Sequence, residues 1–582
     1  MAETASGREQ TDRQEIHEPE SLKFGSTRRS EEFTTENFKV EVTNLPRNIK
    51  YHAVKQIFER YYKIDPHKIR MGDRRAYLAF NNSEQRDEAI EKISKQEWKG
   101  RVLVARQAVA RTDPLVERIK GERTEETEEF DISEESVISR VCPLWDREYD
   151  QQIDFKTTQM KSILSLAKKI LKISPELKKS RGSPLYSWLM KTKDGPCCQF
   201  DGVVRSPQLN GYRNKCEFNV GRDGTVGFKM GRYRDGSDRV ARPPTKCPII
   251  SSIMFEVLDK FQHCLNKMTH LRGYDHVTHE GHVRQLTLRT NKASECLAIV
   301  DLTPQNLSEV DVQSDVSMIV QELSSIKEVV SIYVNISESN NFSEADRTLK
   351  LMYGMEHLFE TLDIYPDKPL SFRIGPRSFF QVNSRAAELL YRSIGELAKL
   401  DGKTAVLDIG CGTGTIGLSV ASQVSFVVGI DIVSSAVEDA RKNAELNKIE
   451  NVLFFAGKAE DLVGEAMSIL KSKLRDLGDG VEIVAIVDPP RVGFNSSFIK
   501  FIRASTIQKI IYIACDAQAN ENLVALCRPP SKAYKGDPFV PTRAKAFDLF
   551  PHTKFCELVL VYERLTKCLE VEPLNRVQAS RS

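Results

Sequence analysis

The strongest constraint on the fold is an alternation of short apolar segments with helical ones between residues 370 and 565. The apolar segments are TAVLDIG, SFVVGID, NVLFFAG, EIVAIVDPP, KIIYIAC and CELVLVYER. Such runs, rich in β-branched residues, are typical of strands buried on both faces of a sheet, with helices as the crossovers. We therefore predict a doubly wound α/β domain over residues 370–567, which would bind its ligands at the carboxyl ends of the strands.

The chain ahead of this domain falls into three structured regions. Residues 37–110 follow the order strand–helix–strand–strand–helix–strand, which predicts a ferredoxin-like RNA-recognition domain. Residues 195–369 contain mostly short strands and turns, which predicts a central α+β domain. Apolar residues recur at helical spacing within residues 151–194, so a helical connector is expected there.

The remaining segments are polar. Residues 111–150 include the acidic run ERTEETEEFDISEES and are expected to form a charged, solvated linker. Residues 1–36 have little to bury and are expected to be a disordered tail, and residues 568–582 a second, loose tail. The chain is thus predicted to be a multidomain α/β protein.

Charge and cysteine usage narrow the classes of partner. The 84 Lys and Arg residues against 81 Asp and Glu leave a net charge of +3, which excludes a basic coat over the whole surface but allows a local basic patch. No apolar run reaches the roughly 18 residues of a membrane span, and the polar N-terminus lacks a signal peptide core. The 12 scattered cysteines, with no C-x-x-C, indicate reduced thiols and no metal site. We expect a cytoplasmic protein, with the nucleus as a second possible compartment.

A glycine-rich loop follows the first strand of the doubly wound domain. Glycines at 410, 412 and 414 would let the backbone approach a ligand closely, and Thr415 stands where a dinucleotide fingerprint has its third glycine. The spacing is similar to the first motif of class I S-adenosylmethionine (AdoMet) methyltransferases. Asp431 ends the next strand, where a carboxylate can accept hydrogen bonds from both ribose hydroxyls. A glycine-rich turn of a flavodoxin-like or dehydrogenase fold remains the alternative.

A second motif, IVDPPR, places Asp488 and two prolines at a strand end. A similar DPP or NPP turn in adenine and amino-group methyltransferases is followed by an aromatic residue that stacks on the base. Here the next residue is Arg491, which argues against methylation of an adenine amino group. A simple turn at the end of a strand is the alternative.

The strand KIIYIAC ends in a candidate nucleophile, Cys515. Carbon 5 of uracil becomes nucleophilic once a thiolate has added to carbon 6, and a separate base must then remove the carbon-5 proton. Glu557, just before the apolar run LVLVY, is the candidate base. The alternative for Cys515 is a small apolar packing residue. Pro196-Cys197 is similar to the nucleophile motif of cytosine-5 DNA methyltransferases, but it lies far upstream of the glycine loop, so we interpret it as structural.

Seven motifs in order carry a family resemblance. They are GYRNKCEF, SFFQVN, LDIGCGTGTIG, GID, DPPR, YIACD and CELVLVYER, spread over residues 195–565. Together they resemble the RNA 5-methyluridine methyltransferases. The resemblance implies AdoMet-dependent methylation of uridine at carbon 5. Because an RNA-recognition-like domain precedes the core, it also implies the T-loop uridine of tRNA as substrate, with the tRNA T-arm as partner and other RNAs as further candidates.

The resemblance also implies roles for single residues. AdoMet would be contacted by Gln381 in SFFQVN, Gly410 and Thr415 in the glycine loop, Asp431 and Asp488. Cys515 would be the nucleophile and Glu557 the proton acceptor. One departure is Asp516, because the family often has Asn after the nucleophile. A carboxylate close to the thiol would raise its pKa.

Two regions are candidates for RNA contact. Residues 201–250 hold ten Lys or Arg against five Asp or Glu, interleaved with Tyr212, Phe218, Phe228 and Tyr233, so we expect phosphate binding and base stacking there. The alternative is a core of aromatics with a solvated charged face. In the N-terminal domain, Glu41 occupies the usual place of a stacking aromatic and Tyr77 alone remains as a stacking face, so independent RNA binding is left open.

Two other functions remain compatible with the sequence. One is an RNA-binding or tRNA-chaperone protein whose methyltransferase fold is vestigial. The other is uridine methylation of another class of RNA.

Overall fold

The computed structural model describes residues 38–108, 131–231 and 239–566, except residues 47–48, 50, 67, 73, 81, 96, 99–100, 175–176, 178–181, 276–279, 338–346, 479, 491–492 and 516–520. The predicted tails, 1–36 and 568–582, lie outside the described residues. The chain divides into an N-terminal unit and a larger unit that begins at Asp131, and each is considered by itself.

The N-terminal unit has the predicted ferredoxin-like fold. Its elements are β1 (Lys39–Thr43), α1 (Tyr51–Gln56) continued by a π-helical turn, β2 (Lys68–Gly72), β3 (Arg75–Ala79), α2 (Ser83–Lys95) and β4 (Val104–Gln107). The strands pair in the order β2-β3-β1-β4. Val40 and Val42 of β1 point into the core with Phe58, which leaves Glu41 on the opposite face of the sheet.

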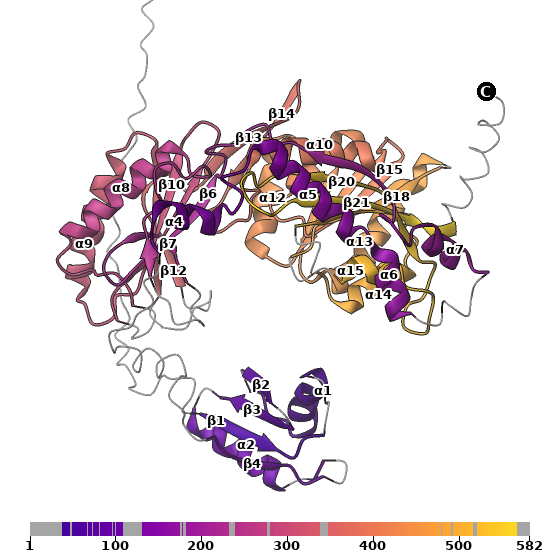
Figure 1. Cartoon of the computed structure of the whole chain (residues 1–582), viewed down its shortest axis with the longest axis horizontal. Helices are drawn as coiled ribbons and strands as arrows, with labels where there is room; N and C mark the ends of the chain where they lie inside the picture. Colours follow the sequence, from indigo (N-terminus) through magenta and orange to yellow (C-terminus); the bar gives the residue numbers. More distant parts are fainter. Residues whose placement is uncertain are drawn as a thin grey trace, which may run out of the picture. The chain divides into compact units, whose positions relative to one another are not determined.

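The central sheet has seven strands in the order β12-β11-β10-β9-β6-β7-β8 (Figure 1). They are β6 (Lys215–Val220), β7 (Val226–Lys229), β8 (Val240–Ala241), β9 (Val283–Thr290), β10 (Cys296–Leu302), β11 (Val329–Ser337) and β12 (Arg347–Gly354). Helices α8 (Ser252–Lys267) and α9 (Glu309–Ser324) pack against each other, and α9 lies on β11. The mixture of antiparallel strands and helices agrees with the predicted α+β character.

The C-terminal sheet has eight strands in the order β17-β16-β15-β18-β19-β21-β20-β5. They are β15 (Thr404–Ile409), β16 (Phe426–Asp431), β17 (Val452–Ala456), β18 (Glu482–Val487), β19 (Lys509–Ala514), β20 (Phe539–Phe547), β21 (Glu557–Arg564) and β5 (Gln199–Val204). The first five pair in parallel, whereas β21 runs antiparallel to both of its neighbours. This order, with one reversed strand, is that of a class I AdoMet methyltransferase domain.

Helices cover both faces of this sheet, as predicted for a doubly wound domain. On one face, α10 (Ser384–Ala398), α11 (Thr415–Val420) and α12 (Ser434–Leu446) bury Val406, Val427 and Ile511. On the other, α13 (Ala459–Leu474), α14 (Ser496–Ala504) and α15 (Asn522–Ala525) bury Leu407 and Val428. Among the described residues, no helix is both long and apolar enough to cross a membrane.

Three predicted boundaries need correction. The last part of the predicted linker 111–150 is folded, because α4 (Glu134–Val141) is capped by Ser133 and buries Val137 and Ile138. Residues 109–130 are outside the described part of the chain. β5 was assigned to the central domain, 195–369, but pairs with β20 of the C-terminal sheet. The limit at residue 369 also cuts a hairpin, β13 (Leu358–Tyr365) and β14 (Lys368–Ile374), which packs in the core of the C-terminal domain.

The predicted connector 151–194 is an integral part of the same domain. It forms α5 (Tyr149–Ile163), α6 (Leu166–Ile173) and α7 (Pro184–Lys191), whose apolar residues share one core with β15, β18 and β19. Helical spacing shows that a segment has an apolar face, but not which surface that face covers.

A buried ion pair joins α5 to the turn between β20 and β21. Lys156 Nζ lies 2.5 Å from Asp548 Oδ1, and both side chains are fully buried. Lys156 also donates to the Phe550 carbonyl at 3.0 Å, and Tyr149 donates to the second Asp548 oxygen at 3.1 Å. Every polar group of the pair thus has a hydrogen-bonding partner nearby, which a buried charge requires.

Replacing one member of this pair is expected to destabilise the larger unit strongly. Lys156→Met leaves the Asp548 carboxylate buried without its cation, which costs about 3–5 kcal/mol of unfolding free energy. Adding Asp548→Asn removes the orphaned charge and recovers part of the loss. Urea unfolding followed by circular dichroism measures both.

A matched control is Lys442→Met, whose partner Glu438 lies 3.5 Å away on an exposed helix face. That change costs at most about 1 kcal/mol. Equal losses for the Lys156 and Lys442 variants would contradict the role given to the buried pair.

Candidate functional site

The glycine loop between β15 and α11 is shaped by two close approaches. A Cβ on Gly410 would lie 2.3 Å from the Asp488 carbonyl oxygen, and Gly410 has φ +81°. A Cβ on Gly414, also at φ +81°, would lie 3.0–3.2 Å from side chains that include Phe454. Only glycine fits both positions without strain, which agrees with the predicted role of the loop as a backbone cradle.

Asp431 lies at the end of β16 and is fixed by the same loop. Its Oδ2 accepts the Gly412 N–H at 2.9 Å, and its Oδ1 accepts the Val433 N–H at 2.9 Å. Both bonds hold the half-buried carboxylate at the carboxyl edge of the sheet, where the sequence predicted an acid for the ribose.

Two further carboxyl groups lie beside the loop, and one of them was missed by the sequence analysis. Burial raises the pKa of Asp488 to about 7, with a further contribution from Asp431. Burial likewise raises the pKa of Asp408 to about 7, and Asp488 adds to the effect. Asp408 was missed because it lies within an apolar strand and looked like part of the glycine motif.

The three acids fit a cationic ligand. Asp408 Oδ2 accepts the Gly417 N–H at 2.9 Å, but its buried Oδ1 has no hydrogen-bond partner among the described residues. Carboxyl groups that repel each other's charge are stabilised by a nearby cation. A ligand with an ammonium and a sulfonium group, such as AdoMet, meets that requirement.

Gln381 and Thr415 are the two other residues predicted to contact the cofactor. Gln381 is 8% exposed, and its backbone carbonyl accepts a hydrogen bond of 2.8 Å from Asn214 of the GYRNKCEF motif. Asn383 caps α10 and also donates to the Leu549 carbonyl at 3.2 Å. Thr415 is the first residue of α11, directly after Gly414. The SFFQVN and GYRNKCEF motifs are therefore structural partners, which their separation in the sequence concealed.

Cys515 and Glu557 meet at the same edge of the sheet. β19 and β21 pair with Ala514 opposite Leu558, so the antiparallel register brings the next residues, Cys515 and Glu557, side by side. Cys515 is half-buried, whereas Glu557 is 1% exposed. Because β21 is reversed, its first residue lies at the edge where β15, β16, β18 and β19 end. The two residues predicted for nucleophile and base are thus neighbours.

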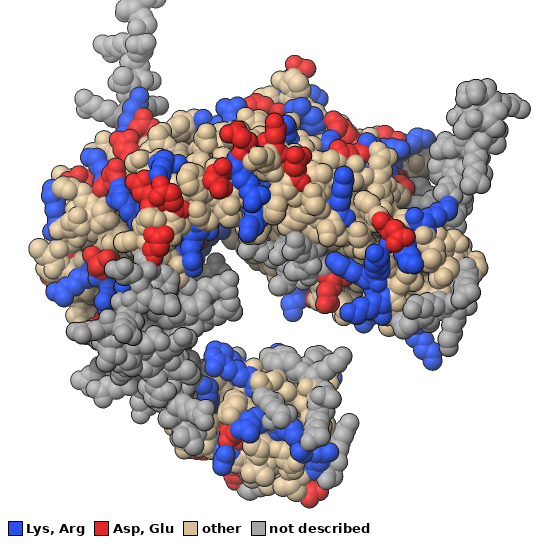
Figure 2. All heavy atoms as spheres, in the orientation of Figure 1, with Lys and Arg blue, Asp and Glu red and all other residues tan. Residues whose placement is uncertain are grey.

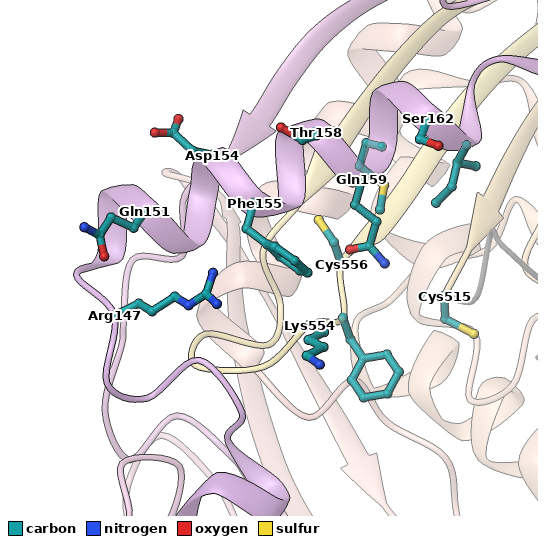
Figure 3. A pocket seen from close by; sticks show the side chains of 13 residues that line it. Arg147, Gln151, Asp154, Phe155, Thr158, Gln159, Ser162, Cys515, Lys554 and Cys556 are labelled. Carbon is teal, nitrogen blue, oxygen red and sulfur yellow. The ribbon is translucent and has the colours of Figure 1, made fainter.

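A cavity of about 840 Å³ opens beside Cys515 (Figure 3). One wall is α5, and the other is the segment 554–556 that leads into β21. In Figure 3, Phe155 extends from α5 toward the space between Arg147 and Lys554, Gln159 extends on its other side, and Asp154 points away from the cavity.

Three other residues that the sequence analysis singled out are Cys197, Arg491 and Asp516. Cys197 is 1% exposed and part of the apolar core, which confirms its structural interpretation. Arg491 and Asp516 lie outside the described residues, so the effect predicted for Asp516 on the thiol stays a prediction.

Comparison with known proteins identifies the family. A family model described as tRNA (uracil-5-)-methyltransferase matches residues 327–565. The tRNA (uracil-5-)-methyltransferase homolog A of Mus musculus is 36% identical, over 92% of this chain and 86% of its own length. This chain belongs to the tRNA (uracil-5-)-methyltransferase family. It is therefore an AdoMet-dependent methyltransferase, as predicted, and the flavodoxin-like and dehydrogenase alternatives are excluded.

Other comparisons agree with this assignment. Homolog B of Homo sapiens is 35% identical, over 74% of this chain and 84% of its own length. A model described as RNA recognition motif matches residues 40–104, which confirms the N-terminal domain. The solved Pyrococcus abyssi tRNA (uracil-54, C5)-methyltransferase, in complex with S-adenosyl-L-homocysteine, shares the fold with a TM-score of 0.50 and 22% identity, covering 80% of this chain and 91% of that one.

The expectation that aromatics of residues 201–250 stack on RNA bases is wrong for two of them. Tyr212 and Phe218 are at most 4% exposed, and Phe218 packs against Phe228 with ring centres 5.6 Å apart. Tyr233 is outside the described residues. The alternative interpretation, an aromatic core, therefore holds for Tyr212 and Phe218, whereas Phe228 is only partly buried.

Five of the ten basic residues in that region already face acids. The pairs are Arg205–Asp150, Lys215–Glu217, Arg222–Asp275, Arg242–Asp259 and Lys246–Glu134. These contacts reduce the positive charge that the segment offers to phosphates. RNA binding by the central domain stays a prediction.

Glu41 of the RNA-recognition domain is neutralised by its neighbours. It is 6% exposed and accepts hydrogen bonds from Arg106 at 2.9 Å, Arg75 at 3.2 Å and Tyr77 at 3.2 Å. The Arg106 hydrogen bond is the main reason why the pKa of Glu41 is lowered. The carboxylate therefore organises two arginines on the sheet face.

The glycine cradle leads to a sharp prediction. Gly410→Ala brings a Cβ into the Asp488 carbonyl and is expected to weaken AdoMet binding at least tenfold, because the loop must shift. Isothermal titration calorimetry with AdoMet measures the change. Gly402→Ala is the matched control, since nothing lies within 4 Å of its Cβ and its φ is ordinary. If Gly410→Ala bound AdoMet with unchanged affinity, the assignment of the loop to the cofactor site would be contradicted.

Proposed function

We propose that this protein methylates carbon 5 of the T-loop uridine of tRNA, with Cys515 as the nucleophile and Glu557 as the base. The observation that carries the proposal is the register of β19 and β21, whose last pair is Ala514 opposite Leu558, so that Cys515 and Glu557 follow on adjacent strands at the edge that also holds the glycine loop. A thiol and a buried carboxylate side by side are the two groups that substitution at carbon 5 of uracil needs.

The chemistry proceeds in three stages. The Cys515 thiolate adds to carbon 6 of uracil, and the resulting enolate makes carbon 5 nucleophilic. Bound AdoMet would supply the methyl group: the bond from that methyl to the sulfonium sulfur breaks as the bond to carbon 5 forms, and S-adenosylhomocysteine is the leaving group. The Glu557 carboxylate then takes the proton from carbon 5, the C6–S bond breaks, and the double bond and the Cys515 thiolate are restored.

The cofactor is assigned to the residues around the glycine loop. Gly410 allows the backbone to approach it, Asp431 accepts from its ribose, and Asp488 faces its charged end. Gln381 and Thr415 complete the contacts that the family resemblance implies. The pairing of Asp431 with two backbone N–H groups supports this, because it holds the carboxylate in one orientation before the ligand arrives.

The substrate is argued from the family and the domain order. Homolog A of Mus musculus and of Homo sapiens, each aligned with 92% of this chain, is named as a tRNA (uracil-5-)-methyltransferase. A uridine in a folded T-arm is stacked, so it must be extruded to reach Cys515.

A covalent trap tests the nucleophile and the base together. With AdoMet and tRNA that contains 5-fluorouridine, the wild-type protein should give a band on a denaturing gel that carries both protein and RNA, because fluorine cannot leave as a proton. Cys515→Ala should give none. With unmodified tRNA, Glu557→Gln should accumulate the same kind of adduct, because the carbon-5 proton stays in place.

Two outcomes would contradict the proposal. One is retention of tRNA methylation by Cys515→Ala. The other is the absence of an adduct with wild-type protein when tRNA binds and a known uridine methyltransferase is trapped in parallel. The second result would favour the RNA-binding protein with a vestigial methyltransferase fold.

Cofactor affinity should depend on pH through Asp488. The pKa near 7 means that the group is largely protonated below pH 6, and a cationic ligand favours the carboxylate form. AdoMet affinity is therefore expected to rise by about tenfold between pH 5.5 and 7, and then to level off. Calorimetry over this range measures it, and Asp488→Asn should reduce the slope of the profile, because Asp408 alone of the two buried acids then titrates near pH 7. An unchanged slope in that variant would assign the titration to another group.

A further inference from the structure

The cavity beside Cys515 has the composition of a nucleotide-binding groove. Phe555 is 53% exposed, and Phe155 is half-buried on the facing wall. Arg147 and Lys554 are exposed cations at its border, and Arg147 lies over the Phe155 ring at 5.7 Å from the ring centre. Aromatic rings flanked by cations are the combination that binds single-stranded bases and their phosphates.

The groove is preformed, because α5 is held rigidly against its opposite wall. Besides the Lys156–Asp548 pair, Gln152 Oε1 accepts the His552 N–H at 2.7 Å, and Gln152 Nε2 donates to the Arg147 carbonyl at 2.9 Å. The Lys156 and His552 contacts join the helix to the segment just before Lys554, and the Arg147 contact fixes the chain that leads into α5. A binding site with fixed walls loses little entropy when it is filled.

A lysine-rich face continues from the groove onto α6. Residues 155–175 contain no Asp or Glu. Four lysines of this stretch have exposed side chains: Lys161, Lys168, Lys169 and Lys172. Figure 2 shows blue side chains gathered where Figure 1 places α6. The net charge of the chain is only +3, so a segment with several lysines and no Asp or Glu forms a local basic surface that attracts a polyanion.

The position of the groove identifies the polyanion as RNA. Cys515 is part of the lining, together with Ser162 and Ile163 at the end of α5. A chain bound in the groove therefore lies next to Cys515 and can extend along α6. An acidic protein segment would suit the lysines, but it would not use the two aromatic rings of a groove that borders the proposed nucleophile.

We propose that the α5–α6 surface, formed by the groove and the four lysines, binds the RNA strand that adjoins the target uridine. Phe555 and Phe155 stack a flanking base, Arg147 and Lys554 contact its phosphates, and the α6 lysines follow the backbone. The Gln159 amide faces the same space and is available to a base edge. This inference rests on the proposed function, since it takes the uridine at Cys515 as its reference point, and it gives a binding role to helices that the sequence marked only as a connector.

Two variants test the proposal in the full-length protein. Phe555→Ala removes the exposed ring, and is expected to weaken binding of unmodified tRNA by about 5- to 100-fold, the range of one lost base stack. The triple variant Lys168→Gln/Lys169→Gln/Lys172→Gln is expected to weaken binding and to reduce the slope of log affinity against log salt by about 2. Filter binding over a salt series measures both, and calorimetry with AdoMet should show unchanged cofactor affinity.

Matched controls use the same substitutions elsewhere. Phe359→Ala removes a 45% exposed ring on β13, and Lys327→Gln/Lys368→Gln/Lys471→Gln removes three exposed lysines outside the α5–α6 surface. Both should bind tRNA as the wild type does. A photocrosslink from 4-thiouridine next to the target position should map to the peptides that contain Phe155 or Phe555.

The outcomes separate the two proposals. If the wild type binds and methylates tRNA but the groove variants match their controls, the groove inference is overturned and the proposed function stands. If the wild type methylates no uridine but loses tRNA binding in the groove variants, the surface is an RNA site and the proposed function fails. Crosslinks confined to other peptides would also overturn the inference.

Discussion

The buried ion pair between Lys156 and Asp548 is the contact on which the site depends. It joins residues 392 positions apart and connects α5 to the turn that leads into β21. Glu557 is the first residue of β21, so the turn that precedes this strand fixes the position of the proposed base. The same turn carries Lys554 and Phe555, so one charge pair fixes both the edge of the catalytic sheet and the wall of the groove. Its partners, Tyr149 and Phe550, satisfy the remaining polar groups, without which a buried pair would cost more than it returns.

The convergence of five strand ends explains how distant motifs form one site. The glycine loop follows β15, Asp431 ends β16, Asp488 follows β18, and Cys515 follows β19. All of these strands are parallel, so their carboxyl ends share an edge. β21 is antiparallel, and therefore only its first residue, Glu557, can reach that edge. The reversed strand is what allows a base to sit beside a nucleophile that comes from the end of its neighbour.

The sequence predicted these strands and the motifs at their ends because both signals are local. Runs such as EIVAIV indicate buried strands, and the glycine spacing indicates a close backbone approach. Long-range pairing gave no comparable signal. β5 was placed in the wrong domain because its partner, β20, lies more than 300 residues away. Tyr212 and Phe218 were misjudged for a related reason, because an aromatic residue among basic ones looks alike whether it faces RNA or a core.

The cofactor side of the proposed site is acidic, whereas the α5–α6 side is basic. On the cofactor side, Asp408, Asp431 and Asp488 are close enough that repulsion adds to burial in raising the pKa values of Asp408 and Asp488. On the α5–α6 side, residues 155–175 have lysines and no acids. The acidic surface on the cofactor side would repel a polyanionic substrate, and the lysine-rich surface would repel a cationic methyl donor. Each surface therefore favours one of the two ligands. The net charge of +3 conceals this separation, because it is the sum of 84 basic and 81 acidic residues over the whole chain. A near-neutral chain can therefore bring a cation and a polyanion to the two sides of one cysteine.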